Sequence, residues 1–129
     1  MPATILVVDD DAATRGVVAR RLERCGFEVH QAAGGEAALR RYREAPVDLV
    51  LTDMLMPDIG GLELVAKLRR EFPAARIVGM SGALTIDVAD VLDEGARLGL
   101  CGRLPKPFTS PQLLAVVRSA LAPSQTCAR

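Results

Sequence analysis

The sequence predicts an α/β fold, with one doubly wound parallel sheet of five strands flanked by five helices. Short apolar runs rich in Val, Ile and Leu alternate with longer segments of helical periodicity, and short connections join them. Strands and helices that alternate in this way form right-handed βαβ units and a parallel sheet. A length of 129 residues suits one domain, and a hydrophobic content of 50% is enough to fill its core.

The beginning of the chain supplies two strands and the helix between them. Residues 4–8 form a short, continuous, β-branched apolar run, as expected of a strand buried on both faces. Asp11 is placed to cap a helix over residues 12–25, and Gly26 suits the left-handed position that ends such a helix. Residues 27–32 are predicted to form the second strand.

The middle of the chain continues the same alternation. A short helix is predicted to open at Gly34 and to run to residue 44. A proline separates this helix from a third strand over residues 47–52. A loop over residues 56–61 then leads to a helix over residues 62–71.

The last part of the chain supplies two more strands and two more helices. In order, we expect a strand over 76–80, a helix over 88–98, a strand over 100–104 and a final helix to about 121. Thr109 and Gln112 have the spacing of a capping box at the start of this final helix. We therefore expect residues 1–122 to form the folded domain and residues 123–129 to form a flexible tail.

Charge, cysteine content and hydropathy exclude several classes of function. The formal net charge is zero, so neither direct nucleic-acid binding nor association with an anionic membrane is expected. The charge is uneven, however, because residues 95–129 carry five Lys and Arg residues and no acid. Cys25, Cys101 and Cys127 are odd in number and lack metal-site spacing, which predicts reduced thiols in a cytoplasmic protein. No signal peptide is visible, and no window reaches the ~20 apolar residues of a membrane span.

Five polar side chains follow the ends of the predicted strands. They are Asp9 and Asp10 after the first strand, Asp53 after the third, Ser81 after the fourth and Lys106 after the fifth. The carboxyl ends of parallel strands meet at one edge of a sheet, where such folds bind their ligands. Two carboxylates ~5 Å apart repel by about 3 kcal/mol at an effective dielectric constant of ~20, so a divalent metal and a fixed lysine are expected beside them.

Each of these residue types suits phosphoryl transfer. Asp10 and Asp53 could hold Mg²⁺, or Mn²⁺, directly while Asp9 acts through water, because Mg²⁺ prefers oxygen ligands and keeps several waters. Asp53 could also attack a phosphoryl group to give an acyl phosphate, with the Ser81 hydroxyl and the Lys106 ammonium on the phosphoryl oxygens. Taken one at a time, the acids and Ser81 also fit turns and helix caps. Lys106 is a stronger indication of a phosphate-binding role, since 14 of the 16 basic residues of this chain are Arg and a Lys here is an exception.

Four motifs resemble the receiver domain of two-component response regulators. They are ILVVDDD ending at Asp11, DMLMPDIGG beginning at Asp53, MSG around Ser81 and LPKPF around Lys106. The resemblance implies a flavodoxin-like topology with strand order 2-1-3-4-5, and phosphorylation of Asp53 by a histidine kinase or a phosphotransfer protein. It also implies that the backbone carbonyl of Leu55 completes the metal site and that the peptide bond before the second proline of LPKPF is cis.

The resemblance also implies an output surface that moves on phosphorylation to control an unidentified partner protein. This surface comprises the fourth helix, the fifth strand and the final helix, with Arg97, Arg103, Val116 and Arg118 as candidate contacts. The family usually carries Tyr or Phe three residues before the lysine, where this chain has Arg103, so the chain departs from the aromatic half of the usual switch. The chain is also longer than compact members between Ser81 and the lysine, which suggests a rebuilt output surface.

Three rival interpretations account less well for the sequence. A haloacid-dehalogenase-type phosphohydrolase shares the first aspartates, but it needs further acids after its lysine, and this chain has none after Glu94. A flavodoxin-like flavin binder needs a hydroxyl-rich phosphate loop, whereas the first loop here holds three aspartates that repel phosphate. A receiver-like interaction module that works without phosphorylation typically lacks one of the five site residues, all of which are present here.

The resemblance yields a first prediction, on the lifetime of the acyl phosphate. The positions two residues beyond Asp53 and Ser81 influence this lifetime in the family, and here they are Leu55 and Ala83, which cannot orient an attacking water. We expect slow self-dephosphorylation and a shorter lifetime in the double variant Leu55→Asn, Ala83→Glu. Loss of the acyl phosphate after removal of the donor measures this rate, and an unchanged rate would contradict the prediction.

Overall fold

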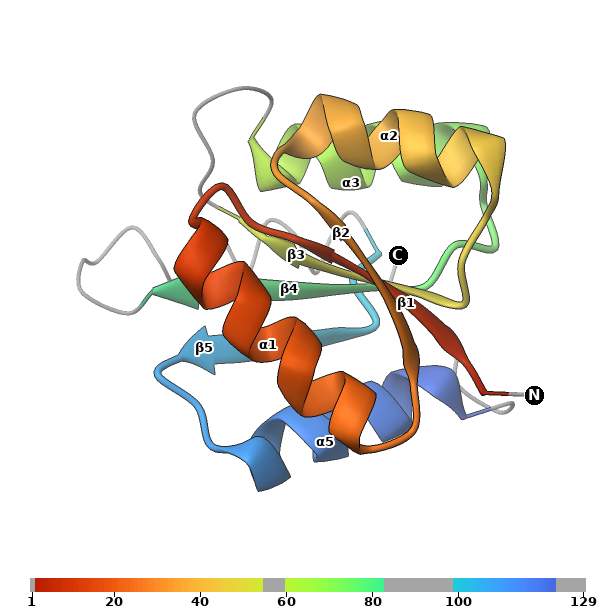
Figure 1. Ribbon diagram of the computed structural model, residues 1–129. Helices are drawn as coiled ribbons and strands as arrows, with labels where there is room; N and C mark the ends of the chain where they lie inside the picture. The colour runs from red at the N-terminus through yellow and green to blue at the C-terminus, as the bar shows by residue number, and fades with distance from the viewer. Residues whose placement is uncertain (1, 55–59, 83–98, 123–129) are drawn as a thin grey trace.

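The computed structural model describes residues 2–54, 60–82 and 99–122 (Figure 1). Its centre is a five-stranded parallel sheet in the order β2-β1-β3-β4-β5, which confirms the predicted fold and strand order. The strands are β1 (Thr4–Val8), β2 (Glu28–Ala32), β3 (Leu49–Asp53), β4 (Ile77–Gly82) and β5 (Gly102–Lys106).

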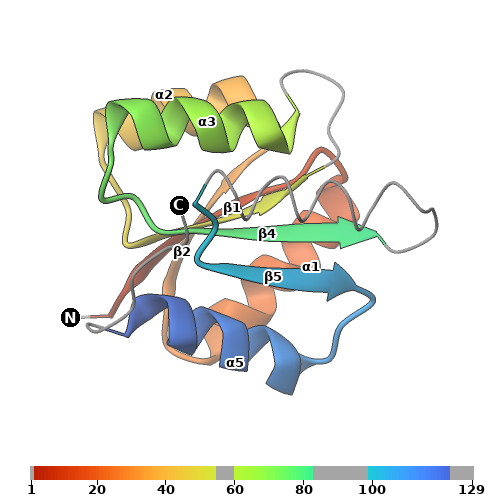
Figure 2. The same ribbon diagram turned by 180° about the vertical axis from the view of Figure 1, so that it is seen from behind.

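The helices cover both faces of the sheet. They are α1 (Ala12–Arg24), α2 (Gly35–Glu44), α3 (Gly61–Glu71) and α5 (Ser110–Leu121). Helices α2 and α3 lie on one face, and α1 and α5 lie on the other (Figures 1 and 2). The predicted helix over 88–98 and the predicted tail over 123–129 lie outside the described residues. In the described part of the chain, no helix is long and apolar enough to cross a membrane.

The two central strands explain the uninterrupted apolar runs of the sequence. Leu6 and Val8 of β1 pack in the cluster under α2 and α3, while Ile5 and Val7 pack in the cluster under α1 and α5. All four side chains are fully buried. A strand that is covered on both faces needs apolar residues at every position, so the period-two alternation of a half-exposed strand is absent.

The predicted caps of α1 and α5 are confirmed. The Asp11 side chain accepts a hydrogen bond from the Ala13 N–H at 3.3 Å, and Gly26 has φ 94° just beyond α1. At α5, Gln112 N–H donates to Thr109 Oγ1 at 3.2 Å while the Gln112 side chain accepts from Thr109 N–H at 2.8 Å. This reciprocal pair is the predicted capping box.

Strands β4 and β5 each end two residues further toward the functional edge than the sequence predicted. Strand β4 runs through Ser81 to Gly82, where a turn was expected. Strand β5 begins and ends two residues later than predicted and includes Pro105. Because β5 is an edge strand, the missing N–H of Pro105 costs no ladder hydrogen bond where it faces away from β4. Ser81 and Lys106 therefore stand on strands rather than in loops.

The cysteines differ in part from the expectation. Cys25 is an exposed free thiol, as predicted, whereas Cys101 is disulfide-bonded, so the prediction of a reduced thiol is wrong at Cys101. The spacing of cysteines along the sequence could not reveal this bond, because it depends on the separation of two side chains in the folded chain.

The packing of α3 against the end of β3 gives a prediction on stability. A Cβ at Gly61 would lie 2.3 Å from Met54 Cα and 2.7 Å from the Asp53 backbone oxygen, both of which are main-chain atoms that cannot rotate away. We expect Gly61→Ala to lower the free energy of unfolding by about 2 kcal/mol through overpacking. Urea denaturation followed by circular dichroism measures this change.

Gly60→Ala is the matched control, since a Cβ there meets nothing within 4 Å. The expected change is within about 0.5 kcal/mol. Equal effects at Gly60 and Gly61 would contradict the steric explanation.

Candidate functional site

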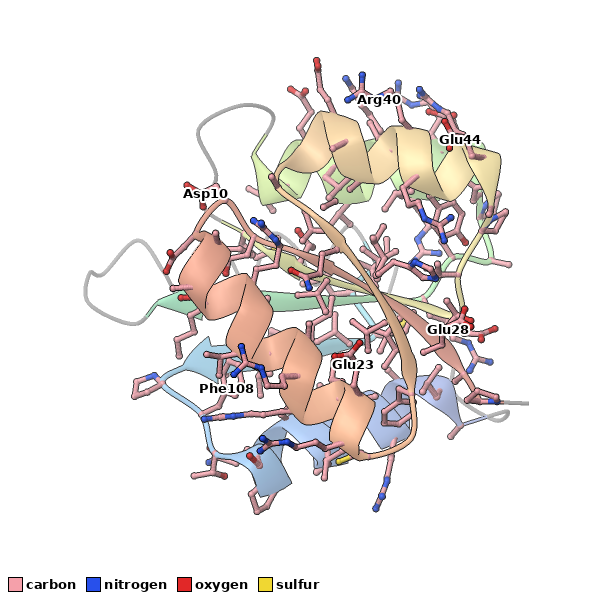
Figure 3. The ribbon with its side chains drawn as sticks, viewed as in Figure 1. Asp10, Glu23, Glu28, Arg40, Glu44 and Phe108 are labelled. Atoms are coloured by element: carbon pink, nitrogen blue, oxygen red, sulfur yellow. The ribbon has the colours of Figure 1, made fainter. Side chains whose placement is uncertain are left out.

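Parallel pairing brings the predicted residues to one edge of the sheet. Val8 pairs with Thr52, which places the residues after β1 beside the end of β3. Asp53 pairs with Met80, and Gly82 pairs with Lys106. Figure 3 shows that Asp10 lies at this same edge, between the end of β1 and the start of α1. Residues that are up to 97 positions apart in sequence are thus neighbours in space.

Three carboxylates form an acidic cluster at this edge. Asp9, Asp10 and Asp53 each offer one oxygen, and these oxygens lie within 4.8 Å of one another. Asp9 is 1% exposed and Asp53 is 8% exposed, whereas Asp10 is open to solvent. Two of the three charges are therefore shielded from water, and they need a partner in the protein or a bound cation.

Lys106 is the partner that the structure provides. Its Nζ donates to Asp9 Oδ2 at 3.0 Å and lies 3.5 Å from Asp53 Oδ2. Burial alone would lower the pKa of the Lys106 ammonium, but the hydrogen bond to Asp9 and the charge of Asp53 outweigh it and raise that pKa above its usual value of 10.5. Lys106 is therefore charged at neutral pH and links β5 to the ends of β1 and β3.

Hydrogen bonds restrain both the carboxylate and the backbone of Asp9. Besides Lys106, the Asp9 carboxylate accepts a hydrogen bond from Asp11 N–H at 2.9 Å. The backbone of Asp9 donates to the Ala32 oxygen at 3.2 Å and accepts from Arg15 Nη1 at 2.7 Å. Asp9 thus has little freedom to move toward a ligand, which fits the predicted role of acting through water.

Ser81 presents a buried hydroxyl that lacks a hydrogen-bond partner in the described part of the chain. The side chain is 0% exposed, and its Oγ belongs to β4 beside Asp53 on β3. Leaving a buried hydroxyl unpaired costs about 1–3 kcal/mol. An orphaned donor at this position is suited to a ligand oxygen that enters the cleft, as the sequence predicted for a phosphoryl group.

The donor set fits a hard divalent cation. Carboxylate oxygens are the ligands that Mg²⁺ and Mn²⁺ prefer, and three carboxylates beside one ammonium leave a net charge of two negative units. The exposed Asp10 leaves one side of the cluster open to water, as Mg²⁺ requires. The predicted ligand at the Leu55 carbonyl lies outside the described residues.

The structure describes three of the four predicted output residues. Arg103 and Val116 both line a groove of ≈ 390 Å³ between β5 and α5. Arg118 is exposed on α5 but does not line this groove. Arg97 lies outside the described residues. The predicted cis peptide bond between Lys106 and Pro107 is present.

A second groove beside Lys106 was not predicted from the sequence. It has a volume of ≈ 400 Å³, and α1 and the segment after β5 line it, including Val17, Arg21 and Phe108. Val17 is 44% exposed and is the exposed large hydrophobic residue of the described chain. The signal available in the sequence was Val17 itself, an apolar residue on the otherwise polar side of the predicted helix, which indicates a contact surface.

The fold and these residues together define a class of protein. It is a doubly wound α/β domain with acids and a lysine gathered at the carboxyl ends of its strands. Residues 5–118 match the family described as the response regulator receiver domain. The chain belongs to this family.

Individual relatives support the same assignment. The chain is 39% identical over 119 residues to the DNA-binding transcriptional regulator NtrC of Azospirillum brasilense, covering 92% of the chain and 24% of that protein. It is 36% identical over 121 residues to the sensor kinase CckA of Brucella abortus, covering 92% of the chain and 12% of that protein. The chain therefore spans about a quarter or less of these relatives.

A solved structure matches the whole domain. The chemotaxis protein CheY4 of Vibrio cholerae superimposes with a TM-score of 0.85 at 31% identity, covering 94% of this chain and 100% of that protein.

The ion pairs of Lys106 give a prediction on stability in metal-free buffer. Lys106→Met leaves the Asp9 carboxylate buried without its cation, and we expect the free energy of unfolding at pH 7 to fall by about 2 kcal/mol. Because folding raises the Lys106 pKa, its contribution is complete below pH 10.5 and is lost as the pH rises through the folded pKa. The difference between parent and variant should therefore shrink above pH 10.5.

Two further variants make this test specific. Lys67→Met removes the only other lysine, from an exposed pair with Glu63, and should cost no more than about 0.5 kcal/mol. Adding Asp9→Asn to Lys106→Met should recover part of the loss, because it removes the unpaired charge. Strictly additive effects in this double-mutant cycle would refute the proposed pairing.

Proposed function

We propose that this protein is a phosphoacceptor of two-component signalling. Asp53 takes a phosphoryl group from a phosphohistidine of a kinase or phosphotransfer protein, and Mg²⁺ or Mn²⁺ is required. The observation that carries this proposal is the convergence of three carboxylates, Lys106 and the orphaned Ser81 hydroxyl at one edge of the sheet. No single residue is decisive, but this combination matches the needs of phosphoryl transfer to a carboxylate.

The chemical step is a displacement at phosphorus. A carboxylate oxygen of Asp53 forms a bond to phosphorus while the P–N bond of the phosphohistidine breaks. The electron pair of that bond stays on the imidazole, which takes up a proton and leaves. Asp53 is left as an acyl phosphate. Asp53 is 8% exposed in the free protein, so a small opening of the site admits the donor without exposing the product widely to water.

The surrounding groups stabilise charge on the transferring phosphoryl group. Lys106 already lies 3.5 Å from Asp53, so a short movement brings its ammonium to a phosphoryl oxygen. Ser81 can donate its unused hydroxyl hydrogen to a second oxygen. Asp9, Asp10 and Asp53 would hold the cation, which supplies electrostatic stabilisation of phosphoryl oxygen charge.

The groove beside α1 is a suitable docking place for the donor. It includes Lys106 itself, so a partner seated there lies directly next to the site. Its lining joins the exposed Val17 and the partly buried Phe108 to the basic Arg21. An apolar contact framed by a positive charge fits a helix of a phosphodonor domain with an apolar stripe and acidic margins.

The output proposal concerns the face formed by the fourth helix, β5 and α5. Ser81 and Pro105 are paired across β4 and β5, so a movement of Ser81 toward the phosphoryl group acts directly on β5. The groove lined by Arg103 and Val116 lies on the other side of β5, against α5. A change in this groove would control the partner protein, and Arg103 gives it a basic character in place of the aromatic residue usual in the family.

The partners and the compartment belong to the same proposal. A histidine kinase or phosphotransfer protein would act upstream and a protein target downstream, in the cytoplasm. The relatives named above include a transcriptional regulator and a sensor kinase, each several times longer than this chain.

Intact-mass spectrometry tests the phosphoacceptor directly. The full chain is incubated with acetyl phosphate and Mg²⁺, and we expect an adduct of one phosphate that hydroxylamine removes. Asp53→Asn should abolish the adduct, and chelation of the metal should suppress it, because both remove groups that the transfer requires.

The remaining outcomes separate the alternatives. An adduct that persists in Asp53→Asn would place the acceptor elsewhere. A parent protein that binds no Mg²⁺ and forms no adduct would favour the phosphorylation-independent interaction module. Metal binding without an adduct would instead call for a phosphorylated histidine domain as the donor.

A further inference from the structure

Arg15 connects the first turn of α1 to the end of β1. Its Nη1 donates to the backbone oxygen of Asp9 at 2.7 Å, and its Nε donates to Gln31 Oε1 at 3.1 Å. Gln31 lies on β2, which pairs with β1. One side chain thus joins a helix and two strands around the peptide bond between Asp9 and Asp10.

This peptide bond sets the backbone plane from which the Asp10 side chain projects. The Asp9 oxygen and the Asp10 nitrogen belong to one planar unit, so a contact that fixes the oxygen also fixes the plane from which Asp10 continues. The preceding Asp9 N–H is held by the Ala32 oxygen at 3.2 Å. The Asp9 backbone is therefore held at its N–H by Ala32 and at its oxygen by Arg15. We call these two contacts the clamp on Asp9.

Asp10 depends on this clamp more than the other two acids do. Asp9 and Asp53 both lie within 3.5 Å of the Lys106 ammonium. Asp10 is exposed, and within the described part of the chain its carboxylate has no hydrogen bond or salt bridge of its own. Its orientation toward the cluster thus comes from its backbone.

We propose that Arg15 is a positioning residue of the metal site, which aims the Asp10 carboxylate at the cation by holding the Asp9 carbonyl. The inference rests on the proposed function, since it takes the acidic cluster to be the metal site. It assigns Arg15 a role different from that of Arg20 and Arg24, which are exposed on the same helix.

The direction in which metal affinity changes on removal of Arg15 distinguishes a positioning role from a purely electrostatic one. A guanidinium close to a cation site repels the cation, so charge alone predicts that removal of Arg15 tightens metal binding. Groups that orient metal ligands have the opposite effect, since their removal weakens metal affinity by roughly 10- to 100-fold. The two explanations therefore predict changes in opposite directions.

The test is metal binding by the full chain in the absence of any phosphoryl donor. Mn²⁺ is titrated and followed by water-proton relaxation, and Mg²⁺ is measured by competition. We expect Arg15→Gln to weaken both affinities by about tenfold. Arg15→Lys, which keeps the charge and one donor, should be intermediate, and Gln31→Ala should cause a smaller loss in the same direction.

Arg40→Gln is the matched control for the loss of one positive charge. Arg40 is exposed on α2, away from the site (Figure 3), and its replacement should leave metal affinity unchanged. The melting temperature without metal is recorded for every variant, because a purely structural role of Arg15 lowers it without changing metal affinity. An Arg15→Gln variant that binds metal as well as or better than the parent overturns the inference.

Phosphorylation by acetyl phosphate gives an independent readout. In Arg15→Gln the Mg²⁺ concentration for half-maximal adduct formation should rise about tenfold, while the rate at saturating Mg²⁺ stays within about twofold of the parent. If the parent binds metal and forms the adduct but Arg15→Gln behaves identically, only the inference about Arg15 fails. If the parent does neither, the proposed function fails and the inference falls with it.

Discussion

The attraction between the Lys106 ammonium and the carboxylates of Asp9 and Asp53 is the interaction on which the site depends. Two nearly buried carboxylates at the ends of adjacent strands repel each other. The ammonium at 3.0 and 3.5 Å offsets this repulsion, while the three carboxylates together still carry more charge than the one lysine. The lysine lies on the edge strand β5. An edge of the sheet therefore supplies the positive charge that balances the acids at the ends of β1 and β3.

The three acids carry different restraints, and this difference has chemical consequences. Asp9 is occupied at its backbone N–H, its backbone oxygen and both carboxylate oxygens, which makes it a fixed element of the site. Asp10 is open to solvent at its carboxylate, and its restraint comes from the neighbouring Asp9 backbone that Arg15 holds. Asp53 lies between these extremes at the end of β3, a fully buried strand that gives it a rigid base. The three acids therefore differ in restraint because of where each strand ends.

The strength of the apolar pattern explains why so much of the fold could be predicted. Continuous Val, Ile and Leu runs mark strands buried on both faces, and Asp11 and Thr109 mark helix starts through contacts that span only a few residues. The predicted fifth strand stops at residue 104, whereas β5 continues through Pro105 to Lys106, because an edge strand tolerates a proline. Neither the Cys101 disulfide nor the Arg15 clamp could be predicted, since both depend on distances that only the folded chain defines.

The position of Lys106 also bears on how a site can act on a distant surface. A bound group shifts a conformational equilibrium only if it contacts the two states differently, and here the candidates for such contacts are Ser81 on β4 and Lys106 on β5. These strands are paired at Ser81–Pro105 and Gly82–Lys106, so both contacts act on the same end of one ladder. Strand β5 is bonded on one side only and is therefore easier to displace than β3 or β4. Arg103 lies three residues before Lys106, or about 10 Å along a strand, so the proposed signal has to travel only the length of β5 to reach the groove beside α5.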